Sequence, residues 1–136
     1  MTQQFKLLVL LLFIGNLTAC QLVSPVFVDY NGVRMDVAKW INHQPLLSMQ
    51  QKRSLVQLSK AQQKLYPIKN IPEDQKLKIA QENSMAMHCA QLHLSQHKIE
   101  QLQSQVFGDV EKQQILDRYN QYFPKVKLDS HSIQCE

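Results

Sequence analysis

The densest group of chemically active side chains lies in Met85-Ala86-Met87-His88-Cys89, which is followed by His93 and His97. In a helix, residues spaced by four share one face, and two histidines at this spacing can bind a soft or borderline metal ion. One hypothesis is therefore a copper or zinc site formed by Met85, Met87, His88, His93 and His97. The alternative is that the methionines and Cys89 are core residues, that Cys89 is oxidised, and that the histidines are partly exposed.

Catalysis is harder to support from the same residues. A histidine beside Cys89 could lower the pKa of its thiol and make it nucleophilic, but no third group is placed to orient the pair. The sequence holds no GxSxG, HExxH or CxxCH motif, and its 3 glycines give little material for a phosphate-binding loop. We expect a protein that is not an enzyme.

The N-terminal residues resemble a secretory signal sequence. Lys6 precedes an apolar run from Leu7 to Ile14, which is too short for a membrane span and is typical of a secretory signal. The run ends in Leu17-Thr18-Ala19-Cys20, which resembles the lipobox of bacterial lipoprotein precursors. This resemblance implies that residues 1–19 are cleaved and that Cys20 receives lipid, including palmitate. With Gln21 after the cysteine, it also implies an outer-membrane protein whose domain faces the periplasm.

Export determines how the remaining cysteines behave. Once Cys20 is lipidated, Cys89 and Cys135 are the two thiols left in an oxidising compartment, so we expect one disulfide between them. Closing a loop of this length would stabilise the fold by ~4 kcal/mol in the chain-entropy treatment. We therefore expect this bond to fasten the polar C-terminal tail to the domain.

Composition indicates one small domain. The precursor has 136 residues with 15 basic and 11 acidic side chains, and only Lys6 leaves with the signal, so the mature net charge is +3. This mild charge does not indicate nucleic-acid binding. We expect a lipidated cysteine and tether over residues 20–32, and then a helical domain over 33–136.

Four helices are predicted, and no strand pair. The first follows Val33 and ends near His43, and the second begins at a capping-box pattern, Ser48 to Gln51, and ends before Pro67. The third runs from Pro72 to Gly108, with Leu77 among the apolar residues that follow its helical period and a break near 95–98 left open. The fourth is capped by Asp109 and ends at Pro124. The expected fold is an all-α bundle of about four helices with a tail stapled by a disulfide.

Two short stretches resemble known helical families. Leu47-Ser48-Met49-Gln50-Gln51 and Ile71-Pro72-Glu73-Asp74-Gln75 resemble the LTxxQ motif of Spy-like periplasmic chaperones, with Ser or Pro in place of Thr. The helical layout and the Ile71 to Asp74 stretch also resemble small pilotin lipoproteins. Both resemblances imply an all-α domain that binds another protein.

A partner-binding surface is the corresponding functional expectation. Amphipathic helices with more apolar stripe than a small core can bury favour a groove for a helix of an envelope protein. The candidate anchors are Tyr66, Tyr119, Tyr122 and Phe123, and the alternative is that they complete the core. The region 52–78 is basic and could contact anionic lipid or an acidic partner; its cations are Lys52, Arg53, Lys60, Lys64, Lys69, Lys76 and Lys78.

Overall fold

The computed structural model of the chain describes residues 32–136, and within this range the secondary structure is helical, without strands. The predicted all-α class is confirmed. The predicted signal peptide, the predicted lipobox with Cys20 and nearly all of the predicted tether lie outside the described residues. None of the described helices is long and apolar enough to cross a membrane.

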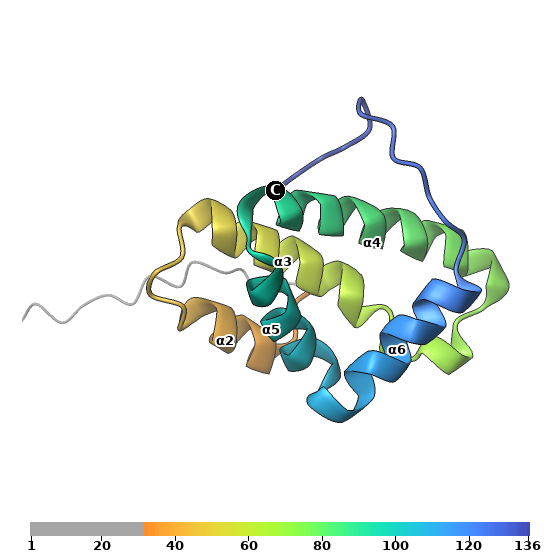
Figure 1. Cartoon of the computed structure of the whole chain (residues 1–136), viewed down its shortest axis with the longest axis horizontal. Helices are drawn as coiled ribbons and strands as arrows, with labels where there is room; N and C mark the ends of the chain where they lie inside the picture. Colours follow the sequence, from red (N-terminus) through yellow and green to blue (C-terminus); the bar gives the residue numbers. More distant parts are fainter. Residues whose placement is uncertain (1–31) are drawn as a thin grey trace, which may run out of the picture.

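Helix α3, Met49–Gln63, is central to the domain and packs against α2, Met35–Asn42, and against α4 and α5 (Figure 1). Its predicted capping box is confirmed: Ser48 Oγ accepts from the Gln51 backbone N–H at 3.2 Å, and the Gln51 side chain accepts from the Ser48 N–H at 2.9 Å. Lys52, predicted to be on an outer face, is instead buried, and its ammonium donates to the Asn42 carbonyl. With neighbours on several sides, α3 has little surface left for solvent.

The single long helix predicted after Pro72 is two helices, α4, Glu73–His93, and α5, Gln96–Phe107. The chain breaks where Leu94 becomes extended, and Ser95 then caps α5 by accepting from the Lys98 N–H at 3.3 Å. The sequence left open whether the helix breaks here. It does break, because Ser95 caps the N-terminus of a new helix. The described chain consequently has five α-helices rather than four, besides the short 3-10 helix η2, Ile68–Asn70.

Helices α3 and α4 run antiparallel. The Gln51 side chain at the start of α3 donates to the His93 carbonyl at the end of α4 (3.1 Å), whereas Lys64 after the end of α3 pairs with Glu82. Helix α4 begins nine residues before Glu82, so its first turns extend beyond the end of α3. Leu77 lies in these turns and is 53% exposed, although it follows the apolar period of the helix.

Gly108 separates α5 from α6, Asp109–Tyr122, and has a φ of +77°. A residue with a Cβ rarely adopts this conformation, which explains glycine at the predicted C-terminal cap. The predicted N-cap of α6 is one residue off, because Gly108 holds that position and Asp109 is the first helical residue, with its carboxylate at the positive end of the helix dipole.

The core is one continuous apolar cluster contributed by every helix. The largest fully buried apolar side chains are those of Ile41, Leu55, Leu58, Leu65, Ile99 and Leu102. Residues after α6 cross over α4 without regular structure and bring the C-terminus back beside the end of α4 (Figure 1). There Cys135 forms the predicted disulfide with Cys89, their Cα atoms 5.5 Å apart, which confirms the stapled tail.

Candidate functional site

The Met/His stripe is not assembled as the metal hypothesis requires. Cys89 is in the disulfide and 0% exposed, and His97 lies on α5, beyond the break that ends α4 at His93. The His97 ring contacts Gln101 of its own helix at 3.1 Å. Among the described residues, no group of three His, Cys, Asp or Glu side chains is close enough to hold a metal ion. Met85, Met87, His88 and His93 all lie on α4, but Met85 and His88 line different hollows of the surface.

The four aromatic residues proposed as anchors differ in how far they are buried. Phe123 is 5% exposed and lies in the core, with Tyr119 half-buried against it at a ring-centre distance of 5.0 Å. Tyr66 and Tyr122 are instead 51% and 54% exposed. The core interpretation therefore describes Phe123 and in part Tyr119, whereas Tyr66 and Tyr122 remain available to a partner.

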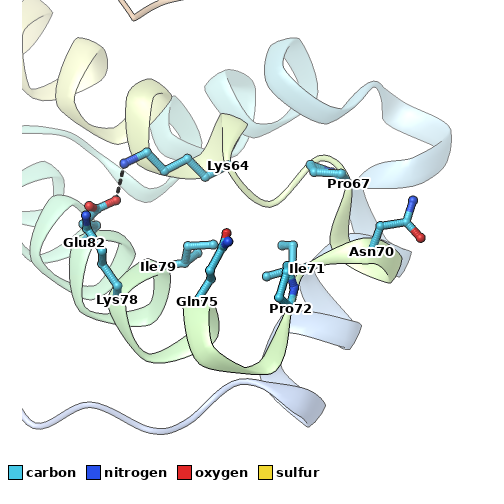
Figure 2. Close-up of a pocket in the computed structure, with 9 residues that line it drawn as sticks. All are labelled: Lys64, Pro67, Asn70, Ile71, Pro72, Gln75, Lys78, Ile79 and Glu82. Atoms are coloured by element: carbon cyan, nitrogen blue, oxygen red, sulfur yellow. Dashed lines mark hydrogen bonds and ion pairs between the residues drawn. The ribbon is translucent and has the colours of Figure 1, made fainter.

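A groove lies between the end of α3, η2 and the first turns of α4, with a cavity volume of about 640 Å³. We call it the η2–α4 groove; its lining residues are Lys64, Pro67, Asn70, Ile71, Pro72, Gln75, Lys78, Ile79 and Glu82. Figure 2 shows Ile71, Gln75 and Ile79 pointing into it from one side, below the segment that carries Lys64 and Pro67. The groove is more apolar than polar and has a charged rim, as partner-binding grooves commonly do.

Three elements place this groove at one end of the domain. Pro67 and Pro72 bound η2, and Pro72 starts α4 because a proline is tolerated where the helix leaves its first N–H groups unpaired. Helix α6 contacts η2, and Phe123 after its last turn lies by Lys76 in the first turns of α4 (Figure 1). Three exposed apolar side chains also belong to segments at this end, although none of them lines the groove: Tyr66 precedes η2, Leu77 is in the first turns of α4, and Tyr122 ends α6. The sequence had grouped Tyr66 with Tyr122 as candidate anchors, but it had not singled out Leu77.

Three of the seven cations of the basic region form ion pairs within the domain. Lys60 pairs with Glu136, Lys64 with Glu82 and Lys76 with Glu73. Lys76 also places its ammonium 5.8 Å from the centre of the Phe123 ring. Lys78, on the groove, makes no ion pair with the described residues. The region thus presents isolated cations rather than a broad positive face.

A second hollow, of about 560 Å³, lies between α3, α4, α5 and α6. We call it the amide hollow because carboxamides dominate its lining, which comprises Gln62, Asn83, Ser84, Met87, His88, Gln91, Gln96, Gln103, Leu116, Tyr119, Asn120 and Leu128. Gln62 is 0% exposed and Asn83 5% exposed. Both amide atoms of Gln62 and Oδ1 of Asn83 make no hydrogen bond within the described chain. Each such buried group costs about 1–3 kcal/mol of stability.

Sequence reasoning missed these amides, since glutamine and asparagine in helices are usually surface residues. The spacing held a signal, because Gln62 lies four residues after Leu58 and three before Leu65 and so falls on the buried stripe of α3.

Compared with protein-family models, with curated proteins and with solved structures, the chain finds no match. The resemblances to Spy-like chaperones and pilotin lipoproteins therefore stay as sequence-based hypotheses, and the function is argued from the domain itself.

Proposed function

We propose that the protein is a bacterial envelope lipoprotein, anchored at the outer membrane through Cys20, whose periplasmic helical domain binds a segment of another envelope protein. The anchor rests on the lipobox motif of residues 17–20. The binding role rests on one observation, the η2–α4 groove with exposed Tyr66, Leu77 and Tyr122 at the same end of the domain. An apolar groove with a charged rim, at an end of the domain that also exposes large apolar side chains, is typical of protein interaction surfaces.

The partner chemistry follows from the groove lining. Ile71, Pro72 and Ile79 supply apolar contact area, and Lys78 supplies a cation without an ion-pair partner in the described domain. The fitting ligand is therefore a short amphipathic segment, most simply one face of a helix, that carries apolar side chains and one acidic residue near Lys78.

The fold also keeps this end of the domain ordered before a partner arrives. Phe123 packs into the core immediately after α6, under the ammonium of Lys76 from α4. Lys64 and Glu82 join α3 to α4 at the edge of the groove, as the dashed line in Figure 2 marks. A groove formed in advance spares the partner part of the ordering cost of association.

Site-specific photo-crosslinking in living cells tests the proposal. A photoreactive residue replaces Gln75, which is exposed and points into the groove, and in a control it replaces Val110, which is 94% exposed at the start of α6. We expect a discrete crosslinked envelope protein from position 75 and none from position 110. The blocking variant Gln75→Trp should abolish co-purification of that protein, whereas Gln81→Trp, on the exposed side of α4, should not. Equal crosslinking at both positions, or unchanged capture by Gln75→Trp, contradicts the groove as the binding site.

A further inference from the structure

The amide hollow is independent of the groove, since the two share no lining residue. It combines a concave shape with buried polar groups that lack partners. Burying an unpaired amide destabilises a fold, and a leucine or methionine at position 62 would fill the same space without that cost. Two such residues, Gln62 on α3 and Asn83 on α4, lie on the same hollow. Two such residues on one cavity call for an explanation, which a bound polar ligand would supply.

We propose that the amide hollow binds a small uncharged ligand that carries an amide group. The unmet hydrogen bonds define the match: Oε1 of Gln62 and Oδ1 of Asn83 each need a donor, and Nε2 of Gln62 needs an acceptor. An amide supplies N–H donors and a carbonyl acceptor in one compact unit.

The charge of the lining excludes strongly ionic ligands. No Asp, Glu, Lys or Arg of the described chain lines the hollow, so, unless His88 is protonated, a full charge placed there would lose its hydration without gaining a counter-ion. Half-buried Met87, Leu116 and Leu128 give apolar contacts, and half-buried Tyr119 adds a ring face and a hydroxyl. The volume of about 560 Å³ lies within the usual range of small-molecule sites.

Access to the deepest amides requires a side-chain adjustment, because the unpaired atoms of Gln62 and Asn83 lie below the solvent-accessible surface. Met87 stands in the wall of the hollow, and its unbranched side chain changes rotamer more easily than the branched leucines do. Binding should therefore perturb Met87 together with the two amides.

Two kinds of molecule share the proposed chemistry, and titration of the isotope-labelled full chain distinguishes them. N-acetylglucosamine represents acetamido sugars and N-acetylglycinamide represents peptide amides. Their charged counterparts, glucosamine and N-acetylglycine, are the matched controls. The side-chain NH2 signals of Gln62 and Asn83 and the methyl signal of Met87 report binding. We expect saturable shifts of all three with at least one neutral amide probe, and shifts at least about tenfold weaker at equal concentration with its charged counterpart.

The Gln62→Met variant should bind the neutral amide probe with an affinity lower by about tenfold or more, while its melting temperature stays equal or rises. Gln81→Met, an exposed glutamine of α4, should bind as the unaltered protein does. If Gln62→Met fails to fold, Asn83→Ala takes its place, with the same expected loss. Linear, unsaturable shifts with both neutral probes, or saturable binding that Gln62→Met leaves unchanged, overturn the proposal.

Discussion

Removing the disulfide with Cys135→Ser should lower the free energy of unfolding by about 2–4 kcal/mol. The bond joins residues 46 positions apart, and the chain-entropy relation gives ~4 kcal/mol for a loop of that length. This value is an upper limit here, because Cys135 lies in a tail without regular structure. Without the bond, the tail after α6 also gains freedom in the folded state, which reduces the difference between the folded and unfolded chains.

The contacts of the tail determine how much freedom it gains. Gln57 of α3 holds it on both sides of Cys135, donating to the Gln134 carbonyl at 2.7 Å and accepting from the Glu136 N–H at 3.2 Å. Gln50 donates to the Glu136 carbonyl at 2.9 Å. These exposed hydrogen bonds are worth about 0.5–1.5 kcal/mol each at most, so they hold the tail only partly once the disulfide is gone.

Urea unfolding of the oxidised protein, of Cys135→Ser and of a His131→Ala control in the exposed tail measures this effect. Serine at position 135 is the cleaner choice because Cys135 is exposed, whereas Cys89 is fully buried. The melting temperature of Cys135→Ser should fall by roughly 10–30 °C, and that of the control should change by less than about 3 °C. A loss below about 1 kcal/mol would show that the staple does not restrict the unfolded chain as we argue.

Three further predictions address the helices. Phe123→Ala should cost about 3–5 kcal/mol because the ring is buried, whereas Tyr122→Ala next to it should stay within about 0.5 kcal/mol, both measured by thermal unfolding. Ser48→Ala should cost about 0.5–2 kcal/mol through loss of the α3 cap, and Ser48→Asp should restore most of it. A hydrogen bond from Arg34 holds the pKa of the Asp36 carboxyl below its ordinary 3.8. Its stabilising contribution is therefore complete above that value and is lost as the pH falls through the lowered pKa, and Asp36→Asn should remove this acid dependence of the urea midpoint.

Helix ends could be predicted from the sequence because short-range chemistry decides them. Ser48 with Gln51 caps α3, Pro67 follows its last turn, and Gly108 takes the positive φ between α5 and α6. Ser95 carries the same signal, but its effect depends on whether Leu94 gains more from the core than from a continuous helix. Leu94 is buried at 8% exposure, which is consistent with a chain that turns there to pack.

The residues of the candidate site could not be predicted in the same way. Helical periodicity indicates which residues share a helix face, but it does not indicate whether another element covers that face. Leu77 follows the helical period, yet it lies where α4 extends past the end of α3 and no neighbouring helix covers it. Tyr122 and Phe123 are adjacent in the sequence, and only the end of α6 at Tyr122 turns one outward and the other into the core. Gln62 shows the opposite error, a polar residue drawn into the interior by its place on the central helix.

Metabolic labelling with palmitate, followed by membrane fractionation, tests the central claim that this is a lipid-anchored envelope protein. The unaltered protein should take up label and sediment with the outer membrane, and Cys20→Ser should take up none and should leave that fraction, because the acyl chains supply the membrane affinity. Unaltered protein that takes up no palmitate, or equal labelling and sedimentation of Cys20→Ser, would contradict the anchor and with it the envelope setting of the proposed binding function.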